Sequence, residues 1–453
     1  MLFSLTNPEV AIMMMGIFLF AVLLGFPIAF TLMAMGLGFG YYAYFDPTKM
    51  EHLFDNRIFQ LFVQNTYTVM DNNVLTAVPL FLFMGYLVER AGIVAKLFFA
   101  IRLASHKLPA SMAVAALITC TLFSTATGII GAVVTLMGLL AWPAMVKAGY
   151  DKKFASGIIC SGGCLGILIP PSIMLIVYSV IAQLSPLRLF AAAIFPGLML
   201  AGLYIGYAVF RAWLNPSIAP KPAAEEIPPP AVIMREVLVS FLPLFSLIIL
   251  VLGTILAGIA TPAEAAAVGA FGALVLSYFY KTLKWKNFKE SVFLTAKTTA
   301  MIMWLFIGSW TFASVFSYLG GHEVFEHFFK SLNLQPWQFL VITQIIIFLL
   351  GWPLEWTEIL IIFVPIFLPL VEFFGVNPYF FAMLIALNLQ TSFLTPPMAM
   401  SAYYLKGVQS KNVELMQIFS GIMPFLGIVI LAMVLMYLFP GIALWLPDQL
   451  FAN

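Results

Sequence analysis

Charged side chains are scarce in this sequence of 453 residues. Lysine, arginine, aspartate and glutamate together make up 9% of it, whereas 63% of the residues are hydrophobic. Because a soluble domain usually carries about 25% charged residues, water cannot be the main solvent of this chain. The net charge of +2 also excludes nucleic-acid binding through a strongly basic face. The composition predicts an all-α protein that crosses a lipid bilayer many times.

Cysteine and histidine are also rare. Cys160 and Cys164 have the spacing of two metal ligands on a helix, but no histidine or carboxylate lies near them in sequence. We therefore interpret them, like Cys120, as packing residues. The four histidines, at positions 52, 106, 322 and 327, fall in predicted loops or at the ends of spans. Since Walker, zinc-protease and nucleophile-elbow motifs are missing too, neither ATP hydrolysis nor another enzymatic activity is expected.

Long apolar stretches recur along the chain, and about 20 such residues span a bilayer core. Apolar length and turn signals predict ten crossings, near 9–24, 28–45, 76–100, 154–182, 186–211, 236–258, 262–280, 297–319, 379–405 and 416–446. The first stretch is interpreted as a retained helix, because it lacks the basic start of a signal peptide. A proline-rich linker at 214–235 separates two predicted halves, 1–213 and 236–453.

Lysine and arginine are distributed unevenly over the predicted loops. They cluster near residues 90–107, 147–153, 211–235, 281–289 and 406–411. Acidic residues dominate near 46–55, 323–326 and 372. Because cytoplasmic loops are enriched in lysine and arginine, the pattern predicts a protein of the bacterial inner membrane with both termini in the periplasm.

Two segments, 110–146 and 338–371, do not fit as crossings. Each has two apolar arms around a polar tip, Ser124–Gly128 in the first and Gly351–Glu358 in the second. Arms of about 13 residues in the second segment reach only about 20 Å, short of the roughly 30 Å hydrocarbon core. Both segments are predicted to be re-entrant helical hairpins, with their tips covered by protein or water. Two cramped full crossings are the alternative interpretation.

The two halves share landmarks at a fixed spacing. Identical residues lie 226 positions apart at Pro143 and Pro369, Gly149 and Gly375, Phe154 and Phe380, and the proline pairs at 170–171 and 396–397. With the predicted topology, the two hairpins open to opposite sides of the membrane. The sequence therefore predicts inverted repeats, which in many secondary transporters bind the substrate at the interface between the repeats.

A proline pair interrupts each span that follows a hairpin, 154–182 and 379–405. Proline cannot continue a helix but suits its first turn, so each span is expected to break near the middle of the membrane. The freed carbonyl groups can bind Na⁺, and the helix N-termini can bind a carboxylate. A simple proline kink is the alternative.

Hydroxyl groups and two acids lie at the hairpin tips. A single serine or threonine in a membrane helix usually bonds to its own backbone, but here such residues gather at both tips. Glu355 and Glu358 are acids within a predicted hairpin, which makes them functional candidates. A tip that reaches water at the outer surface would explain them equally well.

Several ordered motifs resemble the large (M) subunit of TRAP transporters, the tripartite ATP-independent periplasmic carriers. These motifs are Ser124–Gly128, Gly149–Gly157, Gly166–Ser172, Gly258–Gly269 and Asn388–Pro397. The resemblance implies an elevator-type carrier that uses a Na⁺ gradient to import a small carboxylate. It also implies two partners, a small four-helix membrane subunit and a periplasmic substrate-binding protein.

The resemblance also implies two Na⁺ sites, each between a hairpin tip and a broken helix. The candidate Na⁺ ligands are Ser124, Thr125, Thr127, Gly162, Gly166 and Ile169 at the first site, and Pro353, Thr357, Asn388, Thr391 and Thr395 at the second. The candidate substrate contacts are Ser124, Ser172, Glu355, Thr357 and Thr395.

The second tip departs from the family pattern in having Trp352 and Trp356. These aromatic residues look like the branch associated with 2-oxo acids and other monocarboxylates, in contrast to C4-dicarboxylates. A stand-alone ion-coupled carboxylate carrier and a non-transporting membrane subunit or intramembrane enzyme are the alternative functions.

Overall fold

The computed structural model describes residues 5–48, 50–220, 229–410 and 412–451, and over these residues it contains helices, turns and loops but no strand. The main helices of the first half are α1 (Asn7–Leu23), α2 (Ile28–Ala43), α3 (Arg57–Met70), α4 (Ala77–Arg90), α5 (Ile93–Ala104), α6 (Ser111–Thr127), α7 (Ile130–Lys147), α8 (Lys152–Cys164), α9 (Ile173–Ala182) and α10 (Pro186–Leu214). The all-α fold class is confirmed. Residues 221–228 of the predicted linker lie outside the described residues.

The second half has a similar succession of helices. They are α11 (Pro230–Leu256), α12 (Pro262–Phe279), α13 (Trp285–Tyr318), α14 (Gly321–Ser331), α15 (Pro336–Leu350), α16 (Trp356–Glu358), α17 (Val364–Phe373), α18 (Pro378–Leu394), α19 (Met400–Val408), α20 (Leu415–Leu438) and α21 (Gly441–Phe451). A π-helix, Ile359–Phe363, joins α16 to α17, so residues 356–373 form one helical rod.

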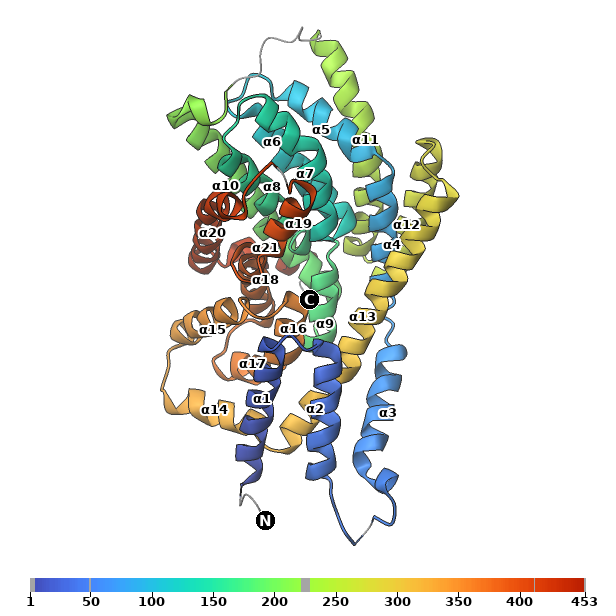
Figure 1. Ribbon diagram of the computed structural model, residues 1–453, viewed down its shortest axis with the longest axis vertical. Helices are drawn as coiled ribbons and strands as arrows, with labels where there is room; N and C mark the ends of the chain where they lie inside the picture. The colour runs from blue at the N-terminus through green and yellow to red at the C-terminus, as the bar shows by residue number, and fades with distance from the viewer. Residues whose placement is uncertain (1–4, 49, 221–228, 411, 452–453) are drawn as a thin grey trace.

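The helices are arranged along one long axis (Figure 1). Helices α2, α4, α12 and α13 run roughly along it, and the pair α6–α7 lies in the upper part with α8. Helices α14, α15 and α17 lie in the lower part, with α9, α16 and α18 between the two groups. The acidic helix α14 and the start of α13 are thus at opposite ends, as the charge pattern predicts. Which end faces the cytoplasm stays a prediction.

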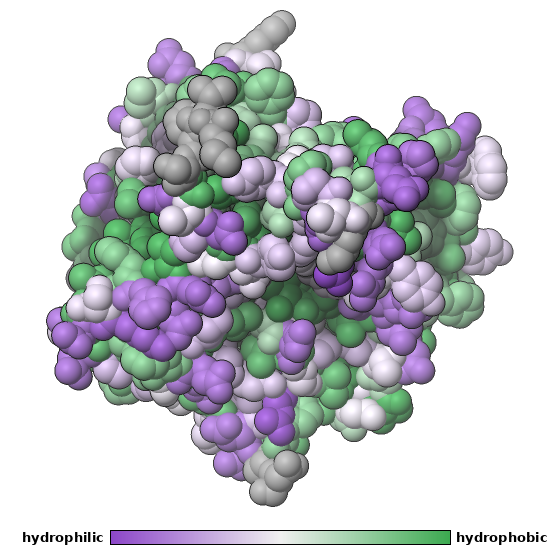
Figure 2. Space-filling model, turned by 90° about the horizontal axis from the view of Figure 1, so that it is seen from below, coloured by the Kyte–Doolittle hydropathy of each residue, from purple (hydrophilic) through white to green (hydrophobic). Residues whose placement is uncertain are grey.

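Helix length and composition are those of a membrane protein. Among the described residues, seven helices are long and apolar enough to cross a bilayer, and the pair α4–α5 would be an eighth. Large apolar side chains such as Leu24, Phe271 and Leu438 are exposed, which suits a lipid environment. In the view from below, polar side chains gather over this end with apolar patches between them and at the rim (Figure 2). Helix length and composition do not fix the number of crossings, so ten crossings stay a prediction.

Three predicted spans have different bounds in the structure. The span near 76–100 is two helices, α4 and α5, bent by 63° at Gly92, whose positive φ of 68° ends the first helix. The span near 416–446 is divided into α20 and α21, because Pro440 cannot continue α20. The span near 297–319 begins twelve residues earlier, at Trp285, since its first turns carry polar residues that a search for apolar runs leaves out.

Two helices occur where only polar loops were expected. Asn56 caps α3 by accepting a hydrogen bond from the backbone N–H of Ile58 at 3.0 Å. Both α3 and α14 are amphipathic: α3 buries Ile58 and Val69, and α14 buries Phe329. Their mixed composition hides them from a search for membrane spans.

The two hairpin segments are helix pairs with short tips. A two-residue turn, Gly128-Ile129, separates α6 from α7, so Ser124–Thr127 form the last turn of α6 rather than a loop. In the second segment, residues 351–355 separate the 15 residues of α15 from the rod 356–373. The arms of the second pair, with 15 and 18 residues, are longer than the 13 residues that the sequence predicted. Arms of 15 to 18 residues reach about 22–27 Å, still short of the roughly 30 Å core, and re-entry stays a prediction.

The spacing of 226 residues extends to the helices. Helix α7 spans 130–147 and its counterpart spans 356–373; α8 begins at 152 and α18 at 378; α9 ends at 182 and α19 at 408. The pairs α6–α7 and α15–α17 lie toward opposite ends of the molecule (Figure 1). The repeated spacing is thus a feature of the helices as well as of the sequence, and the division into two inverted repeats stays a prediction.

Candidate functional site

Both proline pairs interrupt a helix, as predicted. Between α8 and α9 the chain forms a short 3₁₀ turn, Leu165–Ile167, and then passes through Pro170-Pro171. Pro396-Pro397 separates α18 from α19 in the same way, and both pairs have a cis peptide bond. Each span thus supplies one helix that ends and another that begins inside the protein.

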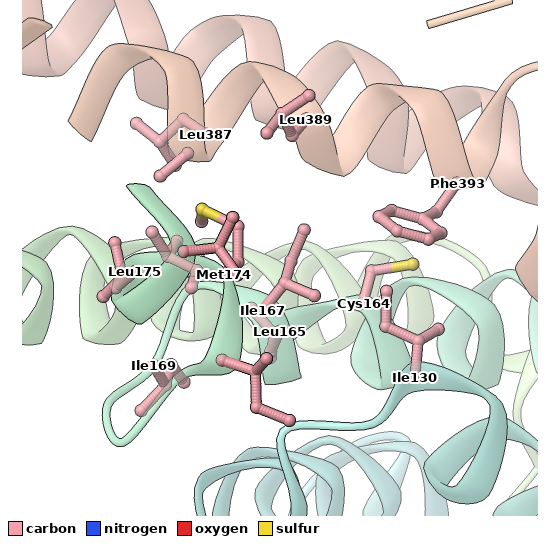
Figure 3. Close-up of a cluster of buried hydrophobic side chains, with 14 of the residues drawn as sticks. Ile130, Cys164, Leu165, Ile167, Ile169, Met174, Leu175, Leu387, Leu389 and Phe393 are labelled. Atoms are coloured by element: carbon pink, nitrogen blue, oxygen red, sulfur yellow. The ribbon is translucent and has the colours of Figure 1, made fainter. Parts of the chain in front are cut away.

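An apolar cluster holds the two broken helices together (Figure 3). Cys164, Ile167 and Met174 come from the first break, and Leu389 and Phe393 from α18 lie across from them. All of these side chains are buried. The cysteines are packing residues here, and the described residues contain no group of three or more metal-ligating side chains.

A cavity of about 240 Å³ lies where the two hairpin tips and the two breaks meet. Its lining residues are Leu82, Tyr86, Gly128, Ile129, Ile130, Gly131, Ile167, Ile173, Thr298, Met301, Ile302, Glu355, Trp356, Thr357, Phe393, Met400 and Tyr404. They include residues of both halves and of the outer helices α4 and α13. This central cavity is the candidate substrate site.

Four helices begin at the central cavity: α7 at Ile130, α9 at Ile173, α16 at Trp356 and α19 at Met400. The first N–H groups of a helix have no partner within it, and its N-terminus carries a partial positive charge. No lysine, arginine or histidine is among the described residues that line the cavity. A carboxylate bound there would be held by helix N-termini and hydroxyl groups.

The hydroxyl groups come from outer helices as well as from the tips. Tyr86 of α4 and Thr298 of α13 have their side-chain oxygens 3.2 Å apart. Tyr404 of α19 and Thr357 complete the set. Sequence reasoning missed Tyr86, Thr298 and Tyr404, because each is a single polar residue in an apolar helix and no local pattern distinguishes it.

The structure brings together two candidate residues of the first predicted Na⁺ site, Ser124 and Gly166. The Ser124 hydroxyl is fully buried and has no hydrogen-bond partner among the described residues. Gly166 faces it, since a Cβ atom at 166 would lie 3.4 Å from Ser124 Oγ. An unpaired buried hydroxyl is costly unless a ligand satisfies it, so this position fits a cation.

The other candidates for this site have structural contacts of their own. Thr125 donates to the carbonyl of Thr121 at 2.7 Å, and Thr127 donates to that of Phe123 at 3.0 Å. Gly162 packs against Cys120, and Ile169 against Gly197. Ser172 caps α9: its Oγ accepts from the N–H of Leu175 at 3.4 Å and donates to the carbonyl of Ile167 at 2.5 Å.

The second predicted site is not assembled from the residues proposed. Thr357 Oγ1 is buried without a partner among the described residues, and Pro353 lies in the tip. Asn388, however, donates to the carbonyl and side-chain oxygens of Gln344 at 2.7 and 2.9 Å. Asn388 and Thr391 line a separate, largely apolar groove of about 380 Å³ between α15, α18 and α20, not the central cavity.

The remaining candidates divide between the cavity and the backbone. Thr395 donates to the carbonyl of Thr391 at 2.8 Å, like an ordinary threonine in a helix. Glu355 lines the central cavity next to Trp356. Glu358 is absent from the lining of this cavity and is buried, so the alternative that the tip reaches water does not hold for Glu358.

Known proteins are similar in sequence to most of this chain. The family model for the DctM component of the tripartite ATP-independent periplasmic transporter matches residues 15–442. The C4-dicarboxylate TRAP transporter large permease DctM of Pseudomonas aeruginosa is 29% identical, covering 85% of this chain and 88% of the relative. The sialic acid permease SiaM of Vibrio cholerae is 29% identical, with coverage of 84% and 87%. The isethionate permease DctMQ of Oleidesulfovibrio alaskensis is 28% identical, with coverage of 84% and 59%.

Solved membrane transporters share the fold. The YdaH transporter of Alcanivorax borkumensis matches with a TM-score of 0.62 and 14% identity, over 96% of this chain and 99% of the other. MtrF of Neisseria gonorrhoeae, described within a class of antimetabolite efflux pumps, matches with a TM-score of 0.55 and 14% identity over 98% and 96%. The family match over nearly the whole chain agrees with the helical architecture and with the motifs. This chain belongs to the DctM family, the large membrane subunits of TRAP transporters, which are transport proteins and not enzymes.

Proposed function

We propose that this subunit imports a monocarboxylate, such as a 2-oxo acid, by Na⁺-coupled symport. The observation that carries the proposal is the convergence of four helix N-termini on a cavity without a basic side chain. Such a site stabilises one carboxylate through N–H groups and dipoles. The chain works in the bacterial inner membrane, with both termini in the periplasm.

The charge of the cavity favours a substrate with a single negative charge. Glu355 is the charged side chain among the residues that line it. A second carboxylate on the substrate would find no basic side chain to pair with and would lie near this acid, which disfavours C4-dicarboxylates. Relatives are named for C4-dicarboxylate, sialic acid and isethionate, so the substrate varies within the family. Trp356 and Tyr404 offer apolar surface to the rest of the molecule.

Sodium coupling is supported by the two buried hydroxyls without partners, Ser124 Oγ and Thr357 Oγ1. Each lies at one hairpin tip, so a cation bound there neighbours the central cavity. Transport follows an elevator mechanism in which the hairpins and broken helices move as a unit along α4 and α13. A small four-helix membrane subunit and a periplasmic binding protein complete the transporter.

Uptake into proteoliposomes that contain both membrane subunits tests the proposal. With the binding protein outside, uptake of a radiolabelled 2-oxo acid should fall at least about tenfold when choline replaces Na⁺, since a tenfold change needs only about 1.4 kcal/mol of coupling. Excess unlabelled pyruvate should compete and succinate should not. Equal uptake under a proton gradient alone would refute Na⁺ coupling. Full activity without the binding protein would favour the stand-alone carrier.

A further inference from the structure

Glu358 is an acid for which neither the substrate cavity nor the predicted Na⁺ sites account. It occupies the first turn of the helical rod 356–373, directly after the second hairpin tip, and only 4% of it is exposed. Its Oε2 atom has no hydrogen-bond partner among the described residues. The ion pairs among the described residues are made by Arg90, Lys286 and Lys330, and none of them includes Glu358.

The polar neighbours of Glu358 are the carboxyl group of Glu355, the side chain of Thr357 and backbone N–H groups of the same turn. The Thr357 side chain is buried as well. A buried carboxylate is retained in proteins when a counter-charge or metal ion compensates it. Carboxylate and hydroxyl oxygens are the ligands that hard cations prefer.

The backbone around Glu358 is unusual as well. Residues 351–355 before it are not helical, and a π-helix, Ile359–Phe363, follows it. π-Helical turns are rare and are frequent at functional sites. Ser309 of α13 donates to the carbonyl of Ile361 within this turn at 3.2 Å, so the π-helix contacts an outer helix. Glu358 therefore lies directly before a turn whose backbone carbonyls do not follow the hydrogen-bond pattern of an α-helix.

We infer that Glu358 is the charged ligand of a coupling-cation site behind the second hairpin tip, with Thr357 as a neutral ligand. Thr357 lines the central cavity, whereas Glu358 does not. A monovalent cation such as Na⁺ bound between them would stand directly behind the substrate's carboxylate, which couples the two bindings electrostatically. Glu358 thus takes the place of Asn388 and Thr391, which face the groove beside α15. This inference rests on the proposed Na⁺ symport and names its second site.

The test compares Glu358→Gln with Glu372→Gln. Glu372 lies on the same helical rod but is exposed, so it is a matched control. The first readout is the thermal unfolding midpoint of the purified subunit in detergent, titrated with NaCl against choline chloride. Na⁺ should raise the midpoint of the wild type and of Glu372→Gln, because a ligand stabilises the state that binds it. Glu358→Gln should lose at least half of that shift, and Glu358→Asp should keep part of it.

The second readout is the ratio of ²²Na⁺ to substrate taken up by proteoliposomes with both partner proteins. Glu358→Gln should transport about one Na⁺ fewer per substrate, and its half-saturating Na⁺ concentration should rise about tenfold. If the wild type depends on Na⁺ but Glu358→Gln has an unchanged ratio and an unchanged midpoint shift, the role of Glu358 is overturned and the proposed symport stands. A wild type that is indifferent to Na⁺ would overturn the proposed symport and this site together.

Discussion

Gly85 of α4 lies directly against Thr127 at the end of α6. A Cβ atom at position 85 would stand 2.7 Å from the Thr127 carbonyl oxygen and 2.9 Å from its Cα. Because these are backbone atoms, they cannot turn aside as a flexible side chain would. Only glycine lets the outer helix α4 approach the first hairpin tip this closely.

Replacing Gly85 by alanine should therefore impair transport. The added methyl group displaces the tip, and overpacking of this kind costs about 1–3 kcal/mol. We expect the uptake rate to fall about tenfold or more, while the protein still assembles in the membrane. Gly38→Ala in α2 is the control, because a Cβ atom there meets nothing within 4 Å. Equal uptake by the two variants would show that the contact has no role in transport.

Ser124→Ala and Thr357→Ala should weaken the dependence on Na⁺. Each removes a buried hydroxyl without a partner, so each should raise the half-saturating Na⁺ concentration about tenfold, equivalent to about 1.4 kcal/mol. Thr125→Val should change it little, since that hydroxyl already donates to Thr121. Uptake measured over a range of Na⁺ concentrations gives the half-saturating concentration of each variant. If Thr125→Val had the larger effect, the cation would lie on the other side of α6.

Tyr404→Phe should lower the affinity for substrate without changing the Na⁺ dependence. The Tyr404 ring lines the central cavity, and the loss of one hydrogen bond to a charged group costs about 1.5–3 kcal/mol. The apparent KM should rise about tenfold or more. Tyr42→Phe, exposed on α2, serves as the control. A normal KM for Tyr404→Phe would mean that its hydroxyl does not reach the substrate.

Gly421→Ala should destabilise the subunit strongly. A Cβ atom at 421 would lie 1.9 Å from the carbonyl oxygen of Lys153, so α20 could no longer pack closely on α8. Overpacking costs about 1–3 kcal/mol, visible as a lower unfolding midpoint in detergent. Gly427→Ala on the same helix meets nothing within 4 Å and should be neutral or slightly stabilising. Equal midpoints would mean that the two helices separate without cost.

Cysteines at positions 147 and 373 should be labelled from opposite sides of the membrane. Lys147 and Phe373 are exposed and lie 226 residues apart, at the ends of matching helices. They are better sites than the neighbouring Gly149 and Gly375, whose positive φ angles disfavour any side chain. A membrane-impermeant maleimide should reach position 373 from the periplasm and position 147 only after the membrane is opened. Labelling of both from one side would contradict the inverted topology.

Local chemistry explains why the sequence predicted the breaks and tips. A proline pair interrupts a helix wherever it occurs, so both breaks could be predicted from residues 170–171 and 396–397. The role of Asn388 could not, because it depends on which way α18 is rotated. Its partner, Gln344, lies 44 residues earlier in the chain. Tyr86 and Thr298 meet across 212 residues, and nothing local signals such a pairing.

Helix α13 has 34 residues and α12 has 18, and both pack against α4. At 1.5 Å per residue, α13 is about 51 Å long and α12 about 27 Å. A hydrocarbon core of about 30 Å matches the shorter helix and not the longer one, so α13 must tilt or extend beyond the lipid. The polar first turns of α13 suit the part that extends into water. Bilayer thickness is therefore a variable that acts differently on these two neighbouring helices.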